Sequence, residues 1–99
     1  MIRQWFDAAE AIAFGREIVR DIDRLIPADP EKRKPTSAKK NQKKLDGLVV
    51  RTRAFAKQHK MNVYKKAKLL NTIKWGLRDA GHDEALIDEI IALLAPVLT

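Results

Sequence analysis

Apolar side chains recur at helical spacing between Trp5 and Ile26, and this periodicity constrains the fold more than any other feature of the chain. With successive residues placed at steps of about 100°, the apolar positions fall on one half of a helix. They are Trp5, Ala8, Ala11, Ile12, Phe14, Ile18, Val19, Ile22, Leu25 and Ile26. Charged residues occupy the opposite half, where Glu17 and Arg20 form a favourable i,i+3 pair. The pattern predicts an amphipathic helix over residues 3–26.

Two prolines end this helix and begin a basic linker over residues 27–36. Pro27 and Pro30 cannot donate a backbone N–H, and each restricts the residue before it, so the helix does not continue through them. Residues 32–44 contain no large apolar side chain, and burial offers little to offset the entropy of ordering them. We therefore expect the linker to be flexible.

A second helix is predicted over residues 37–60, with Thr36 or Ser37 as its N-cap. Lysines occupy its first turns, where the partial positive charge of the helix end makes cations unfavourable, so this end should fray. The alternative is a shorter helix that Asp46 caps, with a break at Gly47.

A third helix is predicted over residues 63–80. Asn62 is its expected N-cap, and Gly81 is the expected left-handed residue after its C-terminus. The arc that we expect to be buried consists of Val63, Ala67, Leu69, Leu70, Ile73 and Leu77.

A fourth helix, over residues 84–95, follows Asp83 as N-cap, and Pro96 should end or distort it. No segment shows the alternation typical of a strand, and no long internal repeat is present. The sequence therefore predicts a single all-α domain over residues 1–99. The simplest architecture is a small four-helix bundle with a flexible basic linker between its first two helices. The wide apolar arcs of the first and fourth helices leave room for a dimer.

The absence of cysteine excludes disulfides, thiolate metal sites and thiol nucleophiles. Charged residues at Arg3, Asp7 and Glu10 interrupt the apolar N-terminal segment, which therefore lacks the continuous run of a signal peptide or membrane span. We expect a soluble, intracellular protein located in the cytoplasm.

Charge is strongly segregated along the chain. Residues 32–78 carry sixteen of the twenty Lys and Arg residues and one carboxylate, Asp46, a net charge of +15, whereas the two flanks together carry −8. Such a field attracts polyanions, or allows the acidic ends to fold back against the basic centre.

Residues able to support catalysis are scarce. His59 lies on the apolar stripe of the second helix, where we expect a half-buried side chain bonded to a backbone carbonyl. His82 lies in a turn, where we expect it to be solvated. Their spacing fits no zinc motif, and the four glycines are isolated rather than grouped in a phosphate-binding loop. Close helix contacts are the ordinary reason for glycines inside helices. We predict no enzymatic activity, no metal, no cofactor and no small-molecule substrate.

The third helix carries the most specific indication of binding. Tyr64, Asn71 and Trp75 follow one another at spacings of seven and four, flanked by Lys68 and Arg78. Aromatic rings interleaved with cations can stack bases or follow a sugar-phosphate backbone. The alternative is that both rings pack against a neighbouring helix. The short link after the second helix also permits a helix-turn-helix, with the third helix in a major groove.

The leading hypothesis is a non-enzymatic basic helical module that binds an anionic partner, with nucleic acid favoured. Its binding should weaken with salt because each phosphate contact releases counterions. The predicted contact residues are Lys32, Arg33, Lys34, Lys39, Lys40, Lys43, Lys44, Arg53, Lys57, Lys60, Tyr64, Lys68, Asn71, Trp75 and Arg78. The alternative is a protein-interaction or self-assembly module, such as a homodimer, in which the lysines maintain solubility. Attachment to a membrane surface is less favoured, because the polar face of the first helix is nearly balanced in charge. The nucleic-acid hypothesis requires that the cations share one exposed surface.

Overall fold

The computed structural model describes residues 2–29, 31, 38–59 and 61–98, with side chains from residue 8 in the first helix and from residue 42 in the second. Over these ranges the chain is all-α: α1 (Ile2–Leu25), α2 (Ala38–Gln58), α3 (Val63–Asp79), α4 (Glu84–Leu94) and a short 3₁₀ helix, η2 (Ala95–Leu98). The predicted four helices are therefore confirmed. The predicted caps of the second helix, at 36 and 37, and most of the linker lie outside the described residues.

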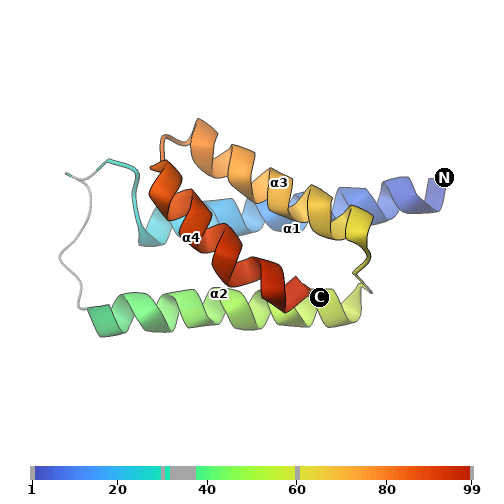
Figure 1. Ribbon diagram of the computed structural model, residues 1–99, viewed down its shortest axis with the longest axis horizontal. Coiled ribbons are helices and arrows are strands. Elements are labelled where there is room, and N and C mark those ends of the chain that lie inside the picture. The colour runs from blue at the N-terminus through green and yellow to red at the C-terminus, as the bar shows by residue number, and fades with distance from the viewer. Residues whose placement is uncertain (1, 30, 32–37, 60, 99) are drawn as a thin grey trace.

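Helices α1 and α3 run side by side in the same direction and form the most extensive packing between helices (Figure 1). Two glycines allow this close approach. A Cβ atom added at Gly15 would lie 2.9 Å from Cγ2 of Thr72, and one added at Gly76 would lie 2.8 Å from Cγ2 of Val19. The second contact lies four residues after the first on both helices, so the two helices stay in register for a full turn. Close helix contact is therefore the reason for these two glycines.

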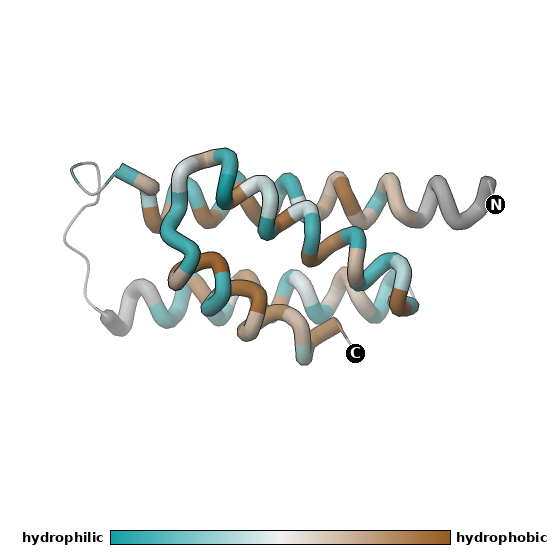
Figure 2. The backbone as a smooth tube through the Cα atoms, turned by 45° about the horizontal axis from the view of Figure 1, so that its top comes forward, coloured by the Kyte–Doolittle hydropathy of each residue, from teal (hydrophilic) through white to brown (hydrophobic). Residues whose placement is uncertain are grey.

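The core is formed by the facing sides of all the helices. The buried apolar side chains of the core cluster are Ala11, Ile18, Ile22, Leu48, Leu69, Ile73, Leu77, Ile87, Ile90, Leu94 and Leu98. The last four come from α4 and η2, whose residues are rich in apolar side chains. These two elements lie across the bundle (Figure 2). The buried hydroxyl of Thr52 donates to the carbonyl of Leu48, at 2.8 Å, so it is not left without a hydrogen bond in this apolar surrounding.

Local signals for helix ends are largely confirmed. The Asn62 side chain accepts a hydrogen bond from the backbone N–H of Lys65, at 2.8 Å, and Gly81 adopts a left-handed φ of 91°. Asp83 precedes α4 in an extended conformation, but its side chain makes no capping hydrogen bond. Helix α4 ends two residues before Pro96, and the chain continues as η2.

The alternative of a shorter second helix is wrong, because α2 continues without interruption through Gly47. Asp46 does not cap it and instead accepts a hydrogen bond from Nε2 of Gln42, at 3.2 Å. No atom lies within 4 Å of a Cβ added at Gly47, so this glycine is not explained by a helix contact.

The predicted buried arc of α3 is wrong at its edge. Val63 is 85% exposed and Ala67 is also exposed, whereas Leu69, Ile73 and Leu77 are fully buried. The close contacts of Thr72 and Gly76 with α1 rotate the helix, so that the buried arc is displaced away from Val63. The face of α3 that carries its aromatic residues consequently points away from the core.

The prediction for His82 is also wrong, since its side chain is fully buried rather than solvated. Nε2 of His82 bonds to the carboxylate of Asp23 at the end of α1. Nδ1 has no hydrogen-bond partner among the described residues. The turn between α3 and α4 is thus fixed against α1, a contact that the local sequence around Gly81 does not indicate.

Within the described parts of the chain, no helix combines the length and apolar character needed to cross a membrane. No cluster of three or more potential metal-ligating side chains is present over the same residues.

Candidate nucleic-acid interface

One face of α3 carries five residues that the sequence singled out, and we call this set the α3 stripe: Tyr64, Lys68, Asn71, Trp75 and Arg78. Their spacings of three and four place them within a single narrow arc of the helix. All five are exposed, and the Tyr64 and Trp75 residues retain 48% and 52% of their accessible surface. Both rings therefore lie outside the buried core, although each borders α1.

Cations of α3 lie against both exposed rings. Nζ of Lys68 is 5.7 Å from the centroid of the Tyr64 ring. The Trp75 ring has Nζ of Lys74 at 5.8 Å and the guanidinium carbon of Arg78 at 5.4 Å. These distances lie within the usual limit of about 6 Å for a cation–π interaction. The contacts orient the rings and keep positive charge beside them, and they add Lys74 to the residues that the sequence had indicated.

The α3 stripe borders two hollows that lie between α3 and α1. The first has a floor of small and aliphatic α1 side chains, and the second extends along α3 past Trp75. The first is lined by Ala8, Ala9, Ile12, Ala13, Arg16, Tyr64 and Lys68, and the second by Ile12, Arg16, Lys68, Asn71, Thr72, Trp75, Gly76 and Asp79. Because they share Ile12, Arg16 and Lys68, the two hollows adjoin, and together we call them the α1–α3 groove.

Arg16 is the residue of this groove that sequence reasoning missed. It lies on the polar side of α1, in the acidic N-terminal part of the chain, so neither its position nor its local charge distinguishes it. The packing of Gly15 against Thr72 brings its neighbour Arg16 beside α3. The position of Arg16 in the groove therefore depends on the register between α1 and α3, which are far apart in the sequence.

Cations outnumber carboxylates at the groove. It is lined by Arg16 and Lys68 and contains one carboxylate, Asp79, while Lys74 and Arg78 lie next to Trp75. The ion pairs found among the described side chains involve none of these four cations. Their positive charge is therefore open to an anionic ligand.

Four predicted cations of α2 have described side chains, and all four are exposed. Lys44 borders one between α1 and α2, and Arg53 and Lys57 border one next to η2. Lys43 is exposed and lines none of these hollows. The remaining predicted contacts, whose side chains lie outside the described residues, are Lys32, Arg33, Lys34, Lys39, Lys40 and Lys60. The groove thus gathers Tyr64, Lys68, Asn71 and Trp75 with Arg16, and Arg78 lies beside the Trp75 ring. The described cations of α2 line other hollows, so the requirement that the cations of both helices share one surface is not met by these residues.

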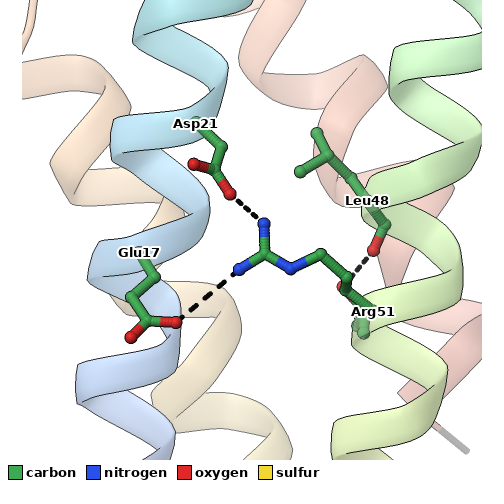
Figure 3. A network of polar contacts seen from close by, with 5 residues as sticks. Glu17, Asp21, Leu48 and Arg51 are labelled. Carbon is green, nitrogen blue, oxygen red and sulfur yellow. Dashed lines mark hydrogen bonds and ion pairs between the residues drawn. The ribbon is translucent and has the colours of Figure 1, made fainter.

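The acidic side of α1 faces α2. The guanidinium of Arg51 forms ion pairs with the carboxylates of Asp21 and, at 3.6 Å, Glu17 (Figure 3). Directly after the end of α2, Nδ1 of His59 lies 2.8 Å from Oε2 of Glu10. The expected carbonyl partner of His59 is thus replaced by a carboxylate. Three carboxylates of the acidic N-terminal helix therefore contact the basic centre, as one reading of the sequence allowed, and they do so at Arg51 and His59 rather than at the α3 stripe.

Aromatic stacking supports the same α1–α2 contact. The rings of Phe14 and Phe55 are parallel within 4° and their centroids are 4.2 Å apart, and the His59 ring lies 4.3 Å from Phe55. At the following turn, the buried Lys65 donates from Nζ to the carbonyl of His59, at 2.8 Å. This cation of α3 is thus used within the fold and is not part of the exposed stripe.

Comparison of the chain with protein-family models, with curated proteins and with solved structures gave no match. The chemistry of the groove is therefore the basis for assigning a function. Its two rings can stack on planar groups, its cations can bind phosphates, and the side-chain amide of Asn71 can donate to and accept from a base edge.

Proposed function

We propose that the protein is a non-enzymatic nucleic-acid-binding module that contacts its ligand through the α3 stripe and Arg16. The observation that carries the proposal is the pair of half-exposed rings, Tyr64 and Trp75, each flanked by cations without a described ion pair. Aromatic rings that are exposed to water are typical of binding surfaces. Rings with cations beside them suit a polymer of planar bases and phosphates.

The charge distribution supports the same proposal. Residues 32–78 carry a net +15, and the carboxylates Glu10, Glu17 and Asp21 of α1 are paired with α2. The cations Lys68, Lys74 and Arg78 of α3 form none of the described ion pairs, which supports a role in binding an external anion. The lysines of the linker and of α2 would add long-range attraction to phosphates, which steers association without selecting a sequence.

Paired substitutions of equal charge test the proposal. Fluorescence anisotropy with a labelled oligonucleotide gives the affinity between about 50 and 200 mM salt. Replacing Lys68 and Arg78 by alanine should weaken binding at least about tenfold and lower the salt slope by about two, because two phosphate contacts are lost. The control replaces Arg53 and Lys57, two exposed cations next to η2, and should weaken binding much less, because only long-range attraction is lost.

Two results would reject this assignment. Absence of binding at micromolar protein and low salt would remove nucleic acid as the ligand. Equal losses for the two pairs would show that net charge, rather than the α3 stripe, determines binding.

The alternative proposal, a protein-interaction or self-assembly module, draws on the exposed apolar side chains Val50, Val63 and Leu93. Each of these three side chains lies on a different helix, α2, α3 and α4 respectively, so no single helix supplies an exposed apolar face made of them. Light scattering at high protein concentration tests it: a mass above the 11.3 kDa of the monomer would favour assembly, and the monomer mass would count against it.

A further inference from the structure

We infer that the α1–α3 groove selects unpaired nucleotides, so that the preferred ligand is a single strand whose bases stack on Tyr64 and Trp75. This inference rests on the proposed function and narrows its ligand class. It depends on the shape of the groove and on the exposure of its two rings.

The first argument is that the groove offers ring faces and an apolar floor. Ala8, Ala9 and Ala13 leave space beside the Tyr64 ring, and Ile12 continues this floor into the second hollow. A flat, weakly polar base fills such a space with one face against an aromatic ring. In a duplex both faces of each base are covered by its neighbours, whereas an unpaired base presents its faces.

The second argument concerns the order of groups along the groove. Tyr64 and Trp75 are eleven residues apart, which corresponds to about 16 Å along the helix axis. Lys68 and Arg16 line both hollows and therefore lie between the two rings. A strand that follows α3 would place bases at the two rings and its intervening phosphates at these cations. Asn71 lies on the same arc and can contact a base edge.

The third argument is that the groove is recessed. A recognition helix reads a duplex by placing side chains on the base edges, at the floor of a major groove about 8.5 Å deep. Tyr64 and Trp75 instead border hollows between two closely packed helices. Rings held beside α1 by the Gly15 and Gly76 contacts are better placed for a strand that enters the hollow.

The test compares one strand in paired and unpaired form. The probes are a labelled oligothymidine of about twelve nucleotides, within the range that a small single-strand-binding fold covers, and its duplex with oligoadenosine. The protein carries Trp5→Phe, which leaves Trp75 as the single tryptophan. We expect the single strand to quench the Trp75 fluorescence and to bind at least about tenfold more tightly than the duplex at equal salt.

Substitutions that replace each ring by a smaller aliphatic side chain complete the test. Trp75→Leu and Tyr64→Leu, each in an otherwise wild-type chain, should each weaken single-strand binding roughly tenfold by anisotropy and leave duplex binding within about twofold. Val63→Ala is the control, because this α3 side chain is 85% exposed and does not line the groove. Circular dichroism verifies that each variant keeps its helix content.

The outcomes separate this inference from the proposed function. Equal affinity for both probes, or equal losses for both on Trp75→Leu, would overturn single-strand selection, while the proposed function would stand if the Lys68 and Arg78 substitutions still weaken binding. Absence of binding to either probe would overturn both. Tighter single-strand binding that depends on both rings would support the inference.

Discussion

The two sides of α1 differ in the charge that they bring to the neighbouring helices α2 and α3. On the side of α2, Glu17 and Asp21 pair with Arg51, and Glu10 contacts His59. On the side of α3, α1 contributes Arg16, a further cation, to a groove that already contains lysine. One helix thus neutralises part of α2 and reinforces the positive charge of α3.

The difference shows why a count of cations does not locate a binding surface. Arg51 and Lys68 both belong to the basic centre of the sequence, yet Arg51 has two carboxylate partners and Lys68 lies against the Tyr64 ring. A cation used in an internal ion pair has less charge to offer a ligand, and an unpaired one beside a ring retains it.

The largest expected effect follows from adding a methyl group to the α1–α3 contact. In Gly76→Ala the new Cβ would lie 2.8 Å from Cγ2 of Val19, a β-branched side chain with little freedom to move. Overpacking of this kind costs about 1–3 kcal/mol of unfolding free energy, more than the helix preference of alanine restores. Urea denaturation followed by circular dichroism measures the loss.

The matched control is Gly47→Ala in α2, where no atom lies within 4 Å of the added Cβ. This substitution should raise the free energy of unfolding by about 0.5–1 kcal/mol, because alanine has the lower entropy cost in a helix. If the two alanine variants shifted stability in the same direction, the close α1–α3 packing described above would be wrong.

A smaller loss is expected on removing the buried histidine that connects α1 to the turn after α3. His82→Ala deletes the hydrogen bond to Asp23 and leaves a void, and it should lower the unfolding free energy by about 1–2 kcal/mol. His59→Ala provides the comparison on the α2 side. Its ring is 27% exposed and its partner Glu10 is 56% exposed, so the loss should be about 1 kcal/mol or less. Urea midpoints that reverse this order would contradict the assigned burial of the two rings.

Features that depend on a few neighbouring residues could be predicted from the sequence. Asn62 and Gly81 delimit α3 through a side-chain cap and a left-handed residue, and Pro96 ends α4 because proline cannot continue a helix. The α3 stripe follows from spacings along one helix. Each of these predictions needs only local backbone chemistry, which the sequence contains.

Features that depend on the register between α1 and α3 could not be predicted. The contact of Gly15 with Thr72 joins residues far apart in the chain, and it determines both the exposure of Val63 and the position of Arg16 in the groove. His82 is a further case, because its burial comes from Asp23 in another helix. Periodicity identifies an apolar arc, but the partner helix sets the rotation of that arc.

The smallest expected change in stability comes from removing the carboxylate partners of Arg51. The same change tests whether these ion pairs limit nucleic-acid binding on the α2 side of α1. Glu17→Gln with Asp21→Asn removes both carboxylate partners but keeps side-chain size. These are partly exposed ion pairs, so the unfolding free energy should fall by less than about 1 kcal/mol. Nucleic-acid affinity at low salt should rise several-fold because Arg51 becomes free to contact phosphate.

The control raises net charge by the same amount without releasing a cation. Asp88→Asn with Glu89→Gln changes two exposed carboxylates of α4 that form none of the described ion pairs. A gain in affinity seen only with Glu17→Gln and Asp21→Asn would show that the internal ion pairs keep Arg51 from binding nucleic acid. Equal gains would show that α1 neutralises α2 only through overall charge. Quenching of Trp75 should be the same in both variants, because neither changes the α1–α3 groove.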